Sequence, residues 1–134
     1  MKSKIGFEVE MKQPYEEAIE LVTQALKAEG FGVLTEINVK ATLKKKLDTE
    51  FRPYAILGAC NPPLAHQALL AEPEVGLMLP CNVTVEASKT GGSIVRILDP
   101  KIMVSVGTFG DNLALVEVAN QAYEKLARVA QSLN

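Results

Sequence analysis

The sequence predicts one small soluble domain of mixed helices and strands that occupies residues 1–134. A chain of 134 residues suits a single domain. Its 48% hydrophobic and 22% charged content is that of a globular protein and is too apolar for a disordered one. Apolar residues recur at a spacing of two in some segments and of three and four in others, which predicts both strands and helices.

The first third of the chain predicts a strand, a long helix and a second strand. Alternating apolar side chains predict a half-buried strand over 5–11. Pro14 suits the start of a helix and Gly30 suits the position after its end, so we expect a helix with one apolar face between them. A second alternating segment predicts a strand over 31–39.

A short helix and a buried strand are expected next. Asn38 can cap a short helix, whose inner face would consist of Val39, Leu43 and Leu47. The strand predicted over 54–60 has small or apolar side chains on both faces. The run Asn61-Pro62-Pro63 then breaks that strand and starts a short helix over 64–71.

The remainder predicts two more strands and two helices. We expect a long strand over 75–85, in which Pro80 marks a bulge or an edge. A hairpin turn at Thr90-Gly91-Gly92 leads to a returning strand over 93–98.

Asp99 and Pro100 predict a short helix over 100–106, with a strand as the alternative because of its β-branched content. Asp111 would cap the last helix, whose apolar residues recur at spacings of three and four as far as Leu133. The expected order is β-α-β-(α)-β-(α)-β-β-(α)-α, with the bracketed helices short.

The strands over 54–60 and 75–85 have too little polar alternation for a sheet with one wet face. Their second face must therefore be covered by the short helices, by a ligand cavity or by another subunit. This observation predicts a homodimer.

Charge and composition exclude several classes of protein. A net charge of −2 and a pI near 5.5 provide no general attraction to nucleic acid or to a membrane surface. No apolar run approaches the roughly 20 residues of a membrane helix, and Glu8 and Glu10 lie where a signal peptide needs apolar residues. Two cysteines are too few for a secreted disulfide scaffold, so we expect a cytoplasmic protein.

A repeated dipeptide, Cys60-Asn61 and Cys81-Asn82, is the main candidate for chemistry. Cys60 ends a strand just before a helix N-terminus, where the helix dipole can favour a reactive thiolate. The structural alternative is that both cysteines are ordinary buried residues and that Asn61 is a helix cap.

His66, the single histidine, lies near the start of the helix after Cys60 and is either a base for that thiol or a surface side chain. Two cysteines and one histidine lack a fourth ligand, so no metal site is predicted, and no motif indicates a cofactor. No disulfide is expected: if the strands are antiparallel neighbours, Cys81 lies about six residues beyond the partner of Cys60, or roughly 20 Å away.

A basic cluster surrounds the second predicted helix and consists of Lys40, Lys44, Lys45, Lys46 and Arg52. It is either a solvated face or a contact for an anion. Asp48, Glu50 and the absence of interleaved aromatic residues argue against nucleic acid.

The stretches 32–37, 41–44, 54–62, 76–83 and 99–100 resemble the domain of unknown function 302 family. The combination of ACNP at 59–62 with LPCN at 79–82 makes this resemblance specific. It implies an α+β fold like that of the TATA-binding protein, with a curved, mainly antiparallel sheet of about five strands, a β-α-β4-α plan and two long helices on the sheet. It also implies a homodimer, but it implies no activity.

The leading hypothesis is a homodimeric cytoplasmic protein that binds a small molecule near the Cys-Asn motifs, with the site residues Cys60, Asn61, Cys81, Asn82 and His66. One alternative is a thiol-dependent enzyme or redox sensor that uses Cys60. Another is an interaction module in which the motifs serve only the fold. Thiol reactivity and a cavity beside the two asparagines would separate these functions.

Overall fold

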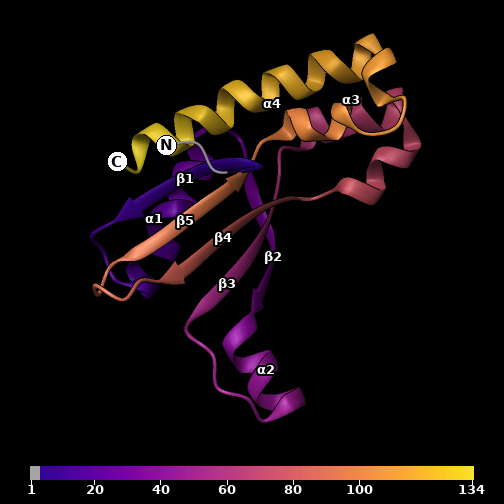
Figure 1. Ribbon diagram of the computed structural model, residues 1–134. Coiled ribbons are helices and arrows are strands. Elements are labelled where there is room, and N and C mark those ends of the chain that lie inside the picture. Colours follow the sequence, from indigo (N-terminus) through magenta and orange to yellow (C-terminus); the bar gives the residue numbers. More distant parts are fainter. Residues whose placement is uncertain (1–3) are drawn as a thin grey trace.

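A five-stranded antiparallel sheet with strand order β1-β5-β4-β3-β2 organises the protein, whose computed structural model describes residues 4–134 (Figure 1). The strands are β1 (Gly6–Met11), β2 (Gly32–Asn38), β3 (Tyr54–Cys60), β4 (Cys81–Ala87) and β5 (Ser93–Leu98). The α-helices are α1 (Tyr15–Ala28), α2 (Val39–Leu47), α3 (Pro62–Ala71) and α4 (Leu113–Ser132). Short 3₁₀-helices are η1 (Pro73–Met78), η2 (Pro100–Ser105) and η3 (Phe109–Asp111). The predicted α+β class and β-α-β4-α order are confirmed.

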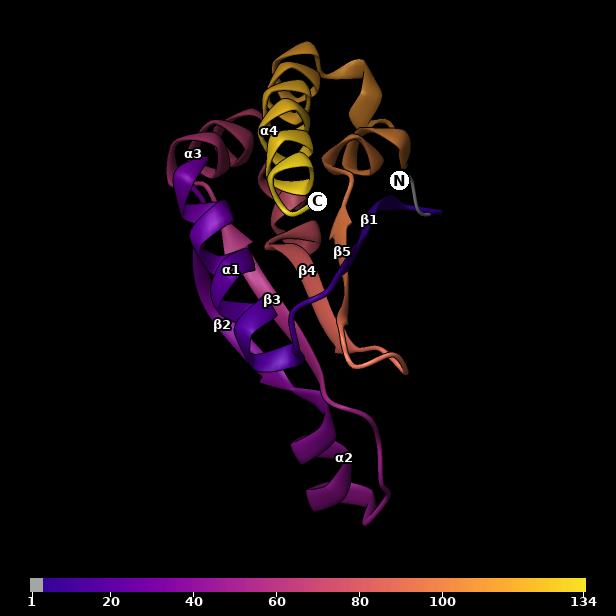
Figure 2. The same cartoon turned by 90° about the vertical axis from the view of Figure 1, so that its left-hand side faces the viewer.

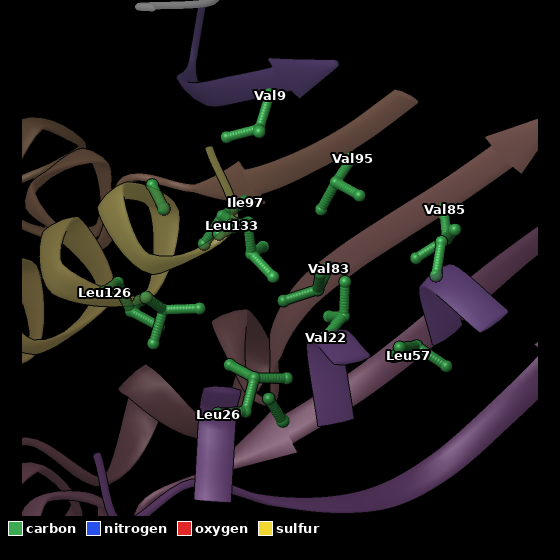
Figure 3. Close-up of a cluster of buried hydrophobic side chains, with 14 of the residues drawn as sticks. Val9, Val22, Leu26, Leu57, Val83, Val85, Val95, Ile97, Leu126 and Leu133 are labelled. Carbon is green, nitrogen blue, oxygen red and sulfur yellow. The ribbon is translucent and has the colours of Figure 1, made fainter. Parts of the chain in front are cut away.

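One face of the sheet forms the main core with α1 and the C-terminal half of α4. Alternate residues of the strands point to this face, because successive side chains of a strand point to opposite sides. Figure 3 shows side chains of α1, α4 and the strands meeting there, among them Val22, Leu26, Leu57, Val83, Val95, Ile97, Leu126 and Leu133.

A second apolar cluster lies beyond the end of the sheet. It joins α3, η1, η2 and the N-terminal half of α4 through Leu64, Ala68, Val75, Met103, Leu115, Val118 and Ala122. The 20 residues of α4 span about 30 Å, so this one helix reaches both clusters.

The other face of the sheet lies in front of α1 in Figure 1 and carries a buried carboxylate. Glu86 accepts hydrogen bonds from Arg96 Nη1 (2.6 Å) and Arg52 Nε, and Arg96 Nε also donates to Glu8 (2.8 Å). Burial alone would raise the pKa of Glu86, but the bonds from Arg96 and Arg52 outweigh it and hold that pKa below its usual value. These partners explain why a charge lies in the middle of this face.

The strand predicted over 75–85 is wrong in its first half. Residues 73–78 form η1, which begins at a proline and is capped by the Glu72 carboxylate, and β4 starts only at Cys81. Val75 is buried by the second apolar cluster, whereas Leu77 is 87% exposed. The alternation of apolar residues over 75–79 therefore did not indicate a strand, because Val75 is a buried residue of a 3₁₀-helix. Pro80, which has no backbone N–H to donate, lies just before β4.

The predicted cap of the last helix is also displaced by one residue. Asn112, not Asp111, caps α4, because its Oδ1 accepts from the backbone N–H of Leu115 (3.1 Å). Its amide also donates to the carbonyl of Ala71 at the end of α3 (2.9 Å). Asp111 belongs to η3 instead.

Among the short elements, the predicted caps Asn38 and Asp99 are confirmed. The helix after Asp99 is the 3₁₀-helix η2, not a strand. The predicted inner face of α2 is not buried, since Leu47 is 67% exposed and α2 projects away from the rest of the protein in both views (Figures 1 and 2). No helix within residues 4–134 is long and apolar enough to cross a membrane.

Two leucines of α4 test this architecture. Leu126 is fully buried between α4 and the sheet, so Leu126→Ala should lower the free energy of unfolding by about 3 kcal/mol. Leu113 lies on the same helix but is 81% exposed, and Leu113→Ala should change stability by less than about 0.5 kcal/mol. Urea unfolding measures both, and equal effects would contradict the described packing of α4.

Candidate functional site

The pairing of β3 with β4 brings the two Cys-Asn motifs together. Ala59 pairs with Cys81 and Gly58 pairs with Asn82, so Cys60 lies one residue beyond the partner of Cys81. The pairing is antiparallel, which was the condition for the expected separation of roughly 20 Å. That separation is wrong, because β4 begins at Cys81 and not six residues earlier. Both thiols are free.

Gly58 is needed for the two motifs to pack. A Cβ at this position would lie 2.3 Å from Thr35 Oγ1 and 2.9 Å from Pro80 Cγ. Only a residue without a side chain lets Pro80 approach β3 this closely. The glycine and the proline that flank the cysteines in the sequence therefore have a steric role.

Asn61 connects α3 to the end of α1 beside the site. Its Oδ1 accepts from the backbone N–H of Leu64 (3.3 Å) and caps α3, which is the role that the structural alternative gave it. Its Nδ2 donates to the carbonyl of Glu29 (3.3 Å), which ties the start of α3 to the end of α1. The neighbouring Gly30 has φ +85°, and a Cβ there would lie 3.0 Å from Asn61 Nδ2. Asn61 thus holds the wall of the site in place.

A cavity of about 330 Å³ lies where the sheet meets the second apolar cluster. Both cysteines and Asn61 line it, together with side chains from β2, β3, α3, η2 and α4. Its other lining residues are Phe31, Leu34, Thr35, Ala59, Leu64, Ala65, Ala68, Leu69, Leu79, Pro80, Met103, Val118 and Ala122. None of these side chains is charged.

The two thiols differ in their environment. Cys81 is buried, and this burial, with a smaller contribution from Cys60, raises the pKa of the Cys81 thiol to about 11. With this pKa the Cys81 thiol is protonated at neutral pH. It is therefore a weak nucleophile, because only the deprotonated form is a strong one. Cys60 is half-buried and reachable from the cavity.

Asn82 and His66 lie apart from the cavity. Asn82 is exposed on β4 and His66 is exposed on α3, and neither lines the cavity wall. Among the cavity-lining residues, no imidazole or carboxylate is present to take a proton from Cys60. Within residues 4–134, no three His, Cys, Asp or Glu side chains gather closely enough to hold a metal ion.

The predicted basic cluster is divided in the structure. Arg52 bonds to Glu86 on the sheet and stacks on Phe51, with its guanidinium carbon 4.5 Å from the ring centroid. The four lysines lie on α2, where Lys44 pairs with Asp48 (2.9 Å). A larger hollow of about 800 Å³ borders Arg52 and Glu86 near the β4–β5 turn, but these two groups already neutralise each other.

Most cavity-lining residues were not predicted as site residues. Leu34, Met103 and Val118 are ordinary apolar residues from three distant parts of the sequence. The Cys-Asn motifs were the only sequence signal of this site that we used. They can be recognised at predicted strand ends, whereas the apolar lining residues become site residues only once α4 is packed.

Comparisons with known proteins agree with this fold. A family model described as "Domain of unknown function DUF302" matches residues 7–133. The crystal structure of an uncharacterized conserved protein DUF302 from Bacillus stearothermophilus is similar, with a TM-score of 0.85 and 29% sequence identity. The similarity covers 98% of this chain and 100% of that one. A comparison with curated protein sequences finds no match.

The two cysteines should differ in alkylation. In the native protein at pH 8, iodoacetamide should modify Cys60 well before Cys81, because Cys81 is buried and its thiol has a pKa of about 11. Peptide mass spectrometry over time measures the two rates, and both cysteines should react in denaturant. Modification of Cys81 as fast as Cys60 in the native state would contradict the described burial.

Proposed function

The chain belongs to the family of domain of unknown function DUF302, which assigns no activity, and from its cavity we propose a homodimeric, cytoplasmic protein that binds a small molecule. The observation that carries the proposal is the cavity of about 330 Å³ bordered by Cys60, Asn61 and Cys81. Small-molecule sites are typically concave and mostly apolar with a few polar groups, and their volumes begin at about 300 Å³. The two free thiols suit a reducing compartment.

The lining favours an uncharged, mainly apolar ligand. A carboxylate or an ammonium group would lose its hydration in the cavity and find no opposite charge there. The Thr35 hydroxyl and the thiols of Cys60 and Cys81 are the polar side-chain groups left to orient a ligand, since both ends of the Asn61 amide bond to backbone groups. A short hydrocarbon chain with one neutral hydrogen-bonding group fits these surroundings.

A series of ligands with one chain and three head groups tests this site. Octanol should raise the melting temperature of the protein, whereas octanoate and octylammonium should not, because only the neutral head group enters without an uncompensated charge. Differential scanning fluorimetry with an extrinsic dye measures the shift.

Two matched variants control this experiment. Ala65→Phe places a ring at the cavity wall and should abolish the octanol shift. Ala114→Phe adds the same ring at an exposed position on α4 and should keep it. Equal shifts for all three compounds, or a full shift in Ala65→Phe, would contradict binding in this cavity.

A thiol-dependent role for Cys60 is the second candidate function. It is favoured by the half-buried thiol that faces the same cavity, next to a second thiol that stays protonated. Loss of octanol binding after selective alkylation of Cys60 would be expected under either function. Turnover that disappears in Cys60→Ala and persists in Cys81→Ala would favour the thiol enzyme.

The homodimer rests on the sheet face that lies opposite α1. Near the β2–β3 edge this face carries the cross-strand pair of Ile37 and Ile56, and Ile37 is 48% exposed. Tyr54 and Gly58 continue the same face of β3. An apolar sheet face of this kind is normally covered, and a second copy related by a two-fold axis supplies the same surface in return.

The dimer is directly measurable. Light scattering at micromolar concentration should report about twice the 14.5 kDa mass of the chain. Ile37→Glu should weaken the dimer at least about tenfold, because it places a charge in the apolar contact. Leu113→Glu, at an exposed leucine of α4, should leave it unchanged. A wild-type monomer at all concentrations would remove the homodimer from the proposal.

A further inference from the structure

The geometry points to α2 as a docking element: we propose that α2 and the loop after it (residues 38–53, the arm) pack on the acidic side of α1 in a second copy of this chain. The inference rests on the homodimer proposed above and adds a second pair of contacts to the sheet-face contact named there. Three observations carry it: an unpacked helix, a charge imbalance, and the position of both surfaces at one end of the sheet.

The arm lacks the packing that a helix of its length needs. α2 has nine residues and none of them is buried, whereas isolated helices shorter than about 12 residues are marginal in water. Local bonds shape it: Asn38 caps its start, Lys44 pairs with Asp48, and Lys40 Nζ donates to the Phe51 carbonyl (3.1 Å). Such exposed contacts contribute little free energy.

The apolar side of α2 is available to a partner. Val39, Leu43 and Leu47 recur every four residues and so share one side of the helix. Val39 and Leu43 are half-buried, but Leu47 is 67% exposed. The stripe thus extends beyond what the chain itself covers.

The charges of the arm and of the remaining chain are opposite. Residues 38–53 carry five cationic side chains and two carboxylates, and one of the cations, Arg52, already pairs with Glu86 of the sheet. The rest of the chain carries nine cationic and fourteen acidic side chains. The arm is therefore attracted to the body of another copy, and a chain with a net charge of −2 repels nucleic acid overall.

An acidic patch lies at the same end of the molecule as the arm. It consists of Glu16, Glu17 and Glu20 on α1 and Glu36 on β2, all exposed. Burial, then the charges of Glu36 and Glu16, raises the pKa of Tyr15, which indicates that both carboxylates lie near one ring. None of the four has an ion-pair partner within the described residues.

The topology places this patch beside the base of the arm. β1 and β2 run in the same direction, so α1, which follows β1, and α2, which follows β2, start from the same end of the sheet. Figure 2 shows the first turn of α1 at the end from which α2 projects. A two-fold axis near this end brings each arm onto the patch of the other copy, which is the reciprocal contact of an isologous dimer.

Charge reversal on both surfaces tests the contact. Lys45→Glu/Lys46→Glu reverses the net charge of the arm, and Glu16→Lys/Glu17→Lys/Glu20→Lys reverses that of the patch. Each variant alone should dimerise at least about tenfold more weakly than wild type at low salt, because like charges then meet in both contacts. An equimolar mixture should form a heterodimer within about threefold of the wild-type affinity, since every contact again joins opposite charges.

Lys27→Glu/Lys101→Glu is the matched control for the arm variant, because it makes the same net charge change at exposed lysines near the opposite end of the sheet. Sedimentation equilibrium measures all affinities, and circular dichroism confirms that each variant is folded. If wild type is a dimer but the arm variant behaves like the control, or if the mixture fails to recover, the arm contact is overturned while the homodimer stands. A monomeric wild type overturns both.

Discussion

The length of α4 is the constraint on which the rest of the structure depends. Leu115 and Leu126 are both fully buried, yet they belong to different apolar clusters about 16 Å apart along the helix. The C-terminal half of α4 covers the sheet. The N-terminal half packs against α3, η1 and η2 beyond the end of the sheet. A rigid helix that serves two cores leaves a seam between them, and the cavity lies at that seam.

The strand ends at this seam explain the unusual residues of the two motifs. Gly58 admits Pro80, and Asn61 uses its amide to join α3 to the end of α1. These residues build the wall of the cavity more than they offer chemistry to its interior. The polar groups that remain free are few and uncharged, which supports a binding role for neutral molecules over acid–base catalysis within the cavity.

The two faces of the sheet differ in what covers them. One is closed by α1 and α4, whereas the other keeps Glu86 ionised through two arginines and carries apolar residues toward the β2–β3 edge. The arm extends from that edge with Leu47 exposed and with Lys45 and Lys46 on its surface. An uncovered sheet face and an unpacked helix at the same end both support a second copy as the partner.

Local patterns in the amino-acid sequence were sufficient to predict several features of the fold. The strand over 54–60, the helices around residues 15–28 and 113–132, the Asn38 and Asn61 caps and the α+β order follow from side-chain periodicity and capping chemistry, and they were predicted. The other features depend on packing between distant parts of the chain. Val75 is buried by α3 and α4 and not by strand pairing, so β4 starts at Cys81 and the two cysteines become neighbours. The packing of α3 leaves His66 exposed to solvent. Contacts between residues far apart in the chain set these outcomes, and no local pattern records them.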